Sequence, residues 1–270
     1  MQRIRVVAVI AAVAVAAAVF FIFFVKVRHA VVVRNAQVAE EVLVGQAKEQ
    51  QDQGNLLKAK ELCQKLINDY PQSNLMGQTQ KQIGDLNARI LFSPAPTADS
   101  KVYVVQPQDT LTKIAKTNNT TADLIKRSNN LSSDLIKPGM KLKVSTAHYS
   151  ILVDKSQNLL TLKAGDEVFK AYPVSTGLDN CTPIGKFTII TKLIDPIWYK
   201  AGAAVPPGSP QNILGSRWLG LSLQGYGIHG TTEPDSIGKQ VTAGCIRMLN
   251  ADVEELYAIV PPGTEVTIVD

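Results

Sequence analysis

The sequence has few cysteines and few aromatic residues, and each scarcity excludes a class of protein. Its 270 residues include three cysteines, none in a C-x-x-C pair, so neither a disulfide-dense domain nor a structural zinc site is expected. Aromatic residues make up 6% of the chain and no long basic stripe is present, which argues against nucleic-acid binding. With 45% apolar and 19% charged residues, the chain is not a disordered one. Its length indicates two domains or several smaller ones.

The N-terminal part of the chain is basic and contains a long apolar run. Residues 1–34 hold five Lys or Arg and no acid, and the twenty residues Val6–Val25 carry no charge. A helix of about 20 apolar residues crosses the hydrocarbon core of a bilayer. Because no A-x-A site follows the run, we expect residues 1–34 to be an uncleaved single-pass anchor in the cytoplasmic membrane, with a cleaved signal peptide as the alternative. The flanking positive charges are balanced and do not set the orientation.

Residues 35–92 have the apolar spacing of helices. Apolar residues recur at steps of three and four from Leu56 to Ile67, Gly54-Asn55 indicates a turn, and Tyr70-Pro71 ends the second helix. The pattern resembles a tetratricopeptide repeat, which implies a site for a protein partner. Such arrays need about three repeats, so a helical spacer is the alternative. Cys63 falls on the apolar stripe and is expected to be buried.

A Pro-containing linker, residues 93–101, leads into a segment with a different pattern. Residues 103–144 predict a short strand, two helices and a second strand after Pro138-Gly139. With its Q-D-T-L, N-N-L and I-K-P-G steps, this segment resembles a LysM module, which implies binding to peptidoglycan or chitin glycan and a domain over residues 102–146. Gln108 stands where that family usually has glycine. The segment carries seven Lys or Arg against three acids, which suits an anionic cell-wall polymer.

The remaining residues, 147–270, are predicted to form a mainly-β domain, sandwich-like or barrel-like. Alternating segments separated by Gly and Pro predict five strands, at 149–153, 159–162, 169–174, 185–192 and 263–269. One late helix is expected from Asn250, with Asn250 as its N-cap and Pro261-Pro262-Gly263 as its stop.

One Cys and one His in this domain indicate thiol chemistry. His229 and Cys245 are separated by fifteen residues, and no metal-ligand spacing surrounds them, so no metal or cofactor is expected. An imidazole beside a thiol takes its proton and stabilises the thiolate, which predicts a lowered thiol pKa. Gly244 leaves room for backbone near the reacting carbonyl, and the amide of Cys245 with its neighbours is a candidate oxyanion hole. By itself this pair is a moderate signal.

The full string is more specific: Gly227-Ile-His229-Gly230, then Thr242-Ala-Gly244-Cys245-Ile-Arg247. It resembles the signature of the L,D-transpeptidase (YkuD-type) catalytic domain. Further matches to that family are Ser175-Thr-Gly177, Thr182-Pro-Ile-Gly185, Leu214-Gly-Ser-Arg-Trp218 and Pro262-Gly-Thr-Glu-Val266. The resemblance implies that Cys245 is the nucleophile, that His229 is the general base and acid, and that the Gly230 carbonyl orients the imidazole. Ala243 replaces a His that many members have.

Three other side chains have open roles. Arg247 either binds a substrate carboxylate or forms a structural salt bridge. Thr242 either donates a hydrogen bond near the site or stabilises the turn. Cys181 is a rival thiol that lacks a His in its own motif, and we expect it to be dispensable.

The resemblance implies an enzyme that forms peptidoglycan cross-links through a cysteine thioester, while the LysM module holds it on the glycan. This substrate places the catalytic domain on the periplasmic or extracytoplasmic side of the membrane. The alternatives are an L,D-carboxypeptidase, transfer to a lipoprotein lysine, or a membrane tether that binds the wall without turnover.

Overall fold

The computed structural model describes residues 20–21, 24–29, 34, 37–200 and 202–270. The predicted anchor Val6–Val25 therefore lies mostly outside the described residues. Within the described part of the chain, no helix is both long and apolar enough to cross a membrane. The chain divides into two units, residues 1–80 and residues 81–270, and each is considered by itself.

The first unit is helical, as its sequence predicts. Residues 37–52 are helical, a turn at Gly54-Asn55 follows, and α2 runs from Leu56 to Asp69 with Tyr70 as its C-cap. The first turns of α3 (Met76–Leu91) complete the unit. Cys63 is buried, together with Ala59 and Leu66 on the same face of α2, which confirms that the thiol is a core residue.

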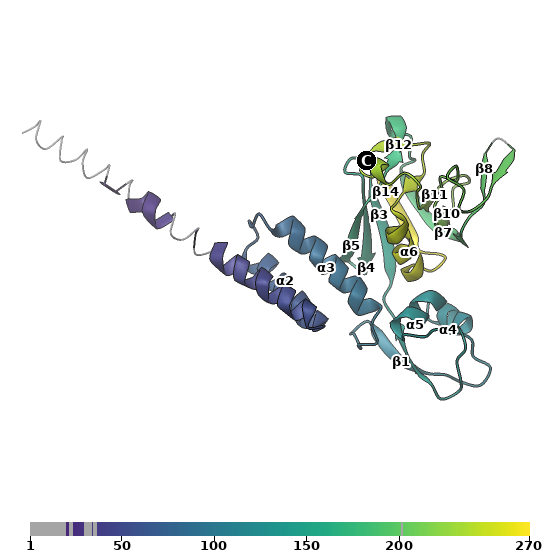
Figure 1. The fold of residues 1–270 in the computed structure, drawn as a ribbon, viewed down its shortest axis with the longest axis horizontal. Helices are drawn as coiled ribbons and strands as arrows, with labels where there is room; N and C mark the ends of the chain where they lie inside the picture. Colours follow the sequence, from purple (N-terminus) through teal and green to yellow (C-terminus); the bar gives the residue numbers. More distant parts are fainter. Residues whose placement is uncertain (1–19, 22–23, 30–33, 35–36, 201) are drawn as a thin grey trace, which may run out of the picture. The chain divides into compact units, whose positions relative to one another are not determined.

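The LysM segment has the expected β-α-α-β order (Figure 1). Strands β1 (Ser100–Val104) and β2 (Lys141–Ser145) are antiparallel, and helices α4 (Leu111–Thr117) and α5 (Ala122–Ser128) lie between them in sequence. Thr110 and Thr121 cap the two helices by accepting hydrogen bonds from the amides of Lys113 and Leu124. Gln108 has φ of +68°, in the left-handed region, which explains why glycine is usual there.

The rest of the second unit is mainly β, as predicted. One sheet has the strand order β13-β11-β10-β7-β14-β3-β4-β5. Its longer strands coincide with the five alternating segments: β3 (Tyr149–Asp154), β4 (Leu159–Ala164), β5 (Glu167–Pro173), β7 (Gly185–Ile194) and β14 (Glu265–Val269). The other three are short: β10 (Arg217–Leu221), β11 (Gly227–His229) and β13 (Ile246–Arg247). Small two-stranded sheets pair β6 (Thr176–Gly177) with β12 (Gln240–Thr242), and β8 (Trp198–Lys200) with β9 (Ala203–Val205).

Both halves of the large sheet share one hydrophobic core with helix α6 (Asn250–Ile259). Ile151 and Leu160 from one half meet Leu219 and Ile228 from the other, and Leu256 of α6 completes the cluster. The sheet therefore curls around a common core, and α6 lies against β10 and β11. Lys192 fixes the C-terminal end of this helix by donating to the carbonyls of Tyr257 and Val260.

The helical segment and the LysM module both contribute to the second unit. Leu91 of α3 and Leu124 of α5 belong to the same core cluster as the strands of the large sheet. Asn87 of α3 donates to the carbonyl of Phe169 in the edge strand β5 at 2.7 Å, and Thr121 of the module donates to the carbonyl of Ala258. The division of the chain into compact units at 80/81 falls within α3, because the second half of this helix packs on the sheet. The predicted domain boundary at residues 92/93 stays a prediction.

Candidate functional site

Two short parallel strands position the Cys and the His. Strands β11 and β13 pair with Ile228 opposite Ile246 and His229 opposite Arg247. Both isoleucines are buried in the core. Because side chains alternate along a strand, His229 and Arg247 lie on the opposite face, and Cys245 precedes Ile246 on that same side. The pairing therefore sets His229 opposite Arg247, and Cys245 directly precedes the strand that carries Arg247.

The imidazole of His229 is buried and fixed in one orientation. Its Nδ1 lies 2.7 Å from the carbonyl oxygen of Gly230, the contact that the resemblance implies. A carbonyl oxygen only accepts hydrogen bonds, so Nδ1 carries the proton and Nε2 keeps a free lone pair. Trp218, the neighbour of His229 across β10 and β11, stacks on the ring with centroids 5.9 Å apart.

The electrostatics of the pair differ from the expectation. Burial lowers the pKa of His229 to about 4, and the charge of Arg247 contributes in the same direction, although the bond to Gly230 opposes both. Burial raises the pKa of the Cys245 thiol, while the amide of Gly227 and the charge of Arg247 oppose that rise. The predicted lowering of the thiol pKa by an imidazolium is therefore wrong in direction. At neutral pH the resting pair is a neutral thiol and a neutral imidazole.

Thr242 and Gly244 shape the turn before Cys245. The Thr242 hydroxyl donates to the carbonyl of Cys245 at 2.7 Å and accepts from the amide of Gly244 at 3.2 Å, so it stabilises the turn. Gly244 has φ of +119°, and a Cβ there would lie 2.8 Å from the ring of Tyr226. A side chain at this position would therefore be strained both by its backbone conformation and by the Tyr226 ring. The Gly244 amide is engaged by Thr242, and an oxyanion hole built on the Cys245 amide and its other neighbours stays a prediction.

Arg247 and Cys181 both neighbour the segment that carries Cys245. Arg247 Nη1 forms a salt bridge with Glu233 Oε2 at 2.8 Å, which is the structural alternative left open by the sequence. A second role in binding a substrate carboxylate stays a prediction. Cys181 is exposed, and its Sγ lies 3.9 Å from the Thr242 carbonyl oxygen, so it neighbours the turn that carries Cys245.

Asn250 is a site residue that the sequence reasoning assigned wrongly. It is the first residue of α6 with Leu249 as the N-cap, and its side chain makes no capping bond. Instead, Asn250 Oδ1 accepts from the amides of Thr231 and Ser216, and Nδ2 donates to the Thr231 carbonyl at 2.9 Å. A Cβ on Gly230 would clash with Asn250 Oδ1. Asn250 therefore holds the segment that directly follows His229, a tertiary role with no local sequence signal.

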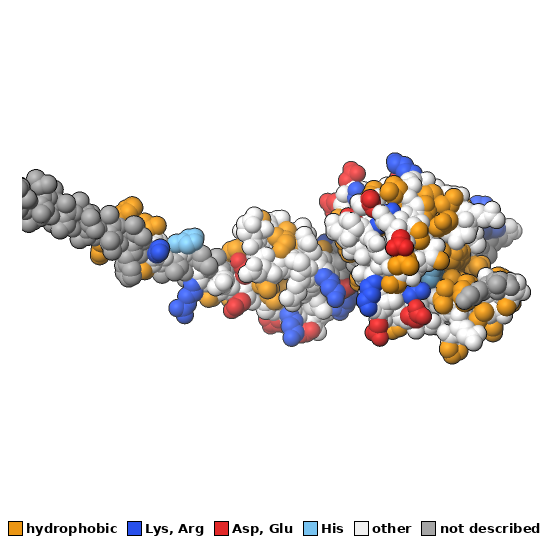
Figure 2. Space-filling model, turned by 90° about the horizontal axis from the view of Figure 1, so that it is seen from above, with side chains coloured by type: hydrophobic (Ala, Val, Ile, Leu, Met, Phe, Trp, Pro, Cys, Tyr) orange, Lys and Arg blue, Asp and Glu red, His pale blue; other side chains and the backbone are white. Residues whose placement is uncertain are grey.

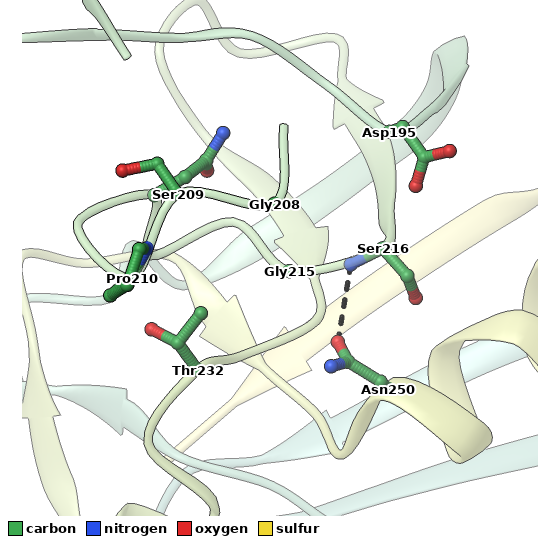
Figure 3. A pocket seen from close by; sticks show the side chains of 9 residues that line it. Asp195, Gly208, Ser209, Pro210, Gly215, Ser216, Thr232 and Asn250 are labelled. Atoms are coloured by element: carbon green, nitrogen blue, oxygen red, sulfur yellow. Dashed lines mark hydrogen bonds between the residues drawn. The ribbon is translucent and has the colours of Figure 1, made fainter. Parts of the chain in front are cut away.

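A small pocket lies beside that segment. Its volume is about 230 Å³, and its lining includes Ser209, Gly215, Ser216, Thr232 and Asn250 (Figure 3). Figure 3 shows the hydrogen bond from the Ser216 amide to Asn250 at its edge. Neither His229 nor Cys245 lines this pocket.

Several large apolar side chains of the second unit are exposed. On β7 and next to or within the β8–β9 hairpin, Ile190, Ile194, Ile197 and Tyr199 are between 46% and 72% exposed. The space-filling view shows hydrophobic side chains at the surface of the second unit (Figure 2).

Comparison with known proteins places these features in one family. The L,D-transpeptidase catalytic domain matches residues 148–268, and the LysM domain matches residues 103–145. A Bacillus licheniformis protein named as an L,D-transpeptidase, YkuD, is 38% identical over 175 residues, covering 62% of this chain and 98% of that protein. Its Bacillus subtilis namesake is 46% identical over 124 residues, covering 46% of this chain and 67% of that protein. Among solved structures, an L,D-transpeptidase from Mycobacterium smegmatis aligns with a TM-score of 0.39 and 21% identity, covering 49% of this chain and 64% of that one. The chain belongs to the L,D-transpeptidase family and carries a LysM domain before its catalytic domain.

Proposed function

We propose that the protein forms peptidoglycan cross-links through a thioester on Cys245, with His229 as the general base and acid. The observation that carries this proposal is the parallel pairing of β11 and β13. With side chains alternating along the strands, it supports a placement of His229 and Cys245 on one face of the sheet. The imidazole is held by Gly230 so that Nε2 is free to accept a proton. The substrate class follows from the family. It is a tetrapeptide stem cleaved between the L-centre of diaminopimelate and the terminal D-Ala.

The chemistry begins from the neutral pair. Cys245 Sγ attacks the amide carbonyl while its proton passes to His229 Nε2, so that no stable thiolate is needed beforehand. The imidazolium then protonates the amine of D-Ala, which leaves, and the thioester remains. An amine of a neighbouring stem attacks the thioester, gives its proton to the imidazole and releases the thiol. Because the imidazole is buried, the electrostatic interactions with charges that develop in these steps are stronger than they would be in water.

The parts of the chain before the catalytic domain determine where the enzyme is located. The LysM domain holds the catalytic domain on glycan strands and raises the local concentration of stems. The apolar run Val6–Val25 anchors the chain in the cytoplasmic membrane, with the catalytic domain outside. The helical first unit offers a surface for a protein partner. The test is a C-terminal fusion to a reporter that works only in the cytoplasm. Activity of this reporter would overturn the proposed topology.

Mass spectrometry of the full chain incubated with a tetrapeptide muropeptide tests the acyl-enzyme. The expected result is an adduct on Cys245 equal to the muropeptide minus D-Ala, followed by a cross-linked dimer when a second stem is supplied. Cys245→Ala should give no adduct. Hydrolysis without a dimer would indicate a carboxypeptidase, and binding to sacculi without any adduct would favour the tether.

A further inference from the structure

Arg247 is held in place by a short segment that follows the His strand. Its side chain is 7% exposed, and Nη1 donates to Glu233 Oε2 at 2.8 Å and to the hydroxyl of Ser236 at 2.9 Å. Its backbone exchanges two hydrogen bonds with Ser175. Arg247 Nε is buried and has no hydrogen-bond partner within the described chain. The orientation of the guanidinium therefore depends on Glu233 and Ser236.

Glu233 is itself well positioned although its side chain is 61% exposed. Its amide donates to the Thr231 hydroxyl at 2.8 Å, and its carbonyl accepts from the Ser236 hydroxyl at 2.6 Å. These bonds fix the start of the turn η2 (Pro234–Ser236) next to β13. The carboxylate thus reaches Arg247 from a defined backbone position.

The guanidinium lies beside both members of the candidate pair. It is opposite His229 across the two strands and two residues after Cys245 on the same face. A positive charge at this place favours a thiolate and disfavours an imidazolium, and Arg247 lowers the pKa of both groups. Among the described residues, the charges of Arg247 and Cys181 shift the pKa of the Cys245 thiol, and the charge of Arg247 shifts the pKa of His229.

We propose that Glu233 is a positioning residue for the Cys245–His229 pair: its carboxylate holds the Arg247 guanidinium beside the pair and offsets part of its charge. The assignment deepens the proposed function and rests on it for its catalytic meaning. The role of Glu233 acts through Arg247 and requires no contact with the substrate.

The test is the rate at which iodoacetamide modifies Cys245 as a function of pH, followed by mass spectrometry of the Cys245 peptide in the full chain. In Glu233→Gln the amide oxygen still accepts from Arg247, but the negative charge is gone. The pH midpoint of alkylation should fall by about half a pH unit, and this shift should shrink in 0.5 M salt because the ion pair is partly exposed. Glu233→Ala also loses the contact, so its midpoint should lie above that of Glu233→Gln.

Asp235→Asn is the matched control, because it removes a neighbouring acid that makes no ion pair with Arg247, and its midpoint should equal that of the wild type. A midpoint of Glu233→Gln that stays at the wild-type value or rises would refute the charge role. Coincident midpoints for Glu233→Gln and Glu233→Ala would refute the holding role. Alkylation needs no muropeptide, so either failure is distinct from a failure of the acyl-enzyme test.

Discussion

The side-chain amide of Asn250 binds both the N–H and the C=O of Thr231, two residues after His229, at 3.0 and 2.9 Å. Through this contact the first turn of α6 fixes the chain that supplies the Gly230 carbonyl to the imidazole. The orientation of the base therefore depends on a helix that was expected to have only a structural role.

Replacing Asn250 by Ala should impair both stability and acylation. It leaves the amides of Thr231 and Ser216 without their acceptor, which costs about 2 kcal/mol of unfolding free energy. The rate of adduct formation on Cys245 should fall about tenfold or more as the His229 segment loosens. Asn250→Asp keeps the acceptor and should lie between the wild type and Asn250→Ala in both measurements, made by urea unfolding and mass spectrometry. Wild-type acylation in a folded Asn250→Ala protein would show that the contact does not position the base.

The buried imidazole should make stability depend on pH. The pKa of His229 is about 4 in the folded chain and about 6.5 when unfolded, so the unfolded state binds more protons between these values. The stabilisation is complete above pH 6.5 and is lost as the pH falls towards 4, to a total of roughly 3 kcal/mol. Urea unfolding at pH 7 and pH 4.5 should therefore show a larger drop for the wild type than for His229→Gln. Equal drops would contradict the buried, neutral imidazole.

Cys181 should be dispensable for acylation. The residue is exposed, and its Sγ lies 3.9 Å from the Thr242 carbonyl in the turn before Cys245. Cys181→Ala should therefore acylate within about twofold of the wild-type rate, whereas Cys245→Ala should not react. The measurement is adduct formation in the three proteins, with and without a reductant. An adduct that forms in Cys245→Ala but not in Cys181→Ala would show that Cys181, and not Cys245, is the nucleophile. A wild-type rate that rises on reduction would instead reveal an inhibitory disulfide between them.

The sequence predicts best where local patterns decide the structure. The alternating segments became β3, β4, β5, β7 and β14, and the βααβ order of the LysM domain followed from caps and turns. Strands β10, β11 and β13 were not predicted, because they are two to five residues long and exist through pairing with neighbours. The thiol pKa was predicted in the wrong direction because burial depends on the whole domain. Asn250 looked like a cap because its partners, Thr231 and Ser216, are distant in sequence.

The attachment of helix α3 to the LysM domain gives the last prediction. Lys143 of β2 is 7% exposed, and its Nζ donates to the carbonyls of Ile90, Leu91 and Ser93 at the end of α3. The carbonyl of Ile90 also accepts from the amide and hydroxyl of Ser93, so the ammonium of Lys143 adds a charged donor to the last carbonyls of α3 and to the residue that follows it.

Lys143→Met keeps the apolar stem but removes all three donors, and it should lower the unfolding free energy by about 2–3 kcal/mol. Lys141→Met, at an exposed position of the same strand, is the matched control and should change it by less than about 0.5 kcal/mol. Urea unfolding followed by circular dichroism makes the comparison. Equal stability of the two variants would mean that the ammonium of Lys143 adds nothing to the junction, and that the packing of Leu91 and Leu124 in the shared core holds α3 against the domain by itself.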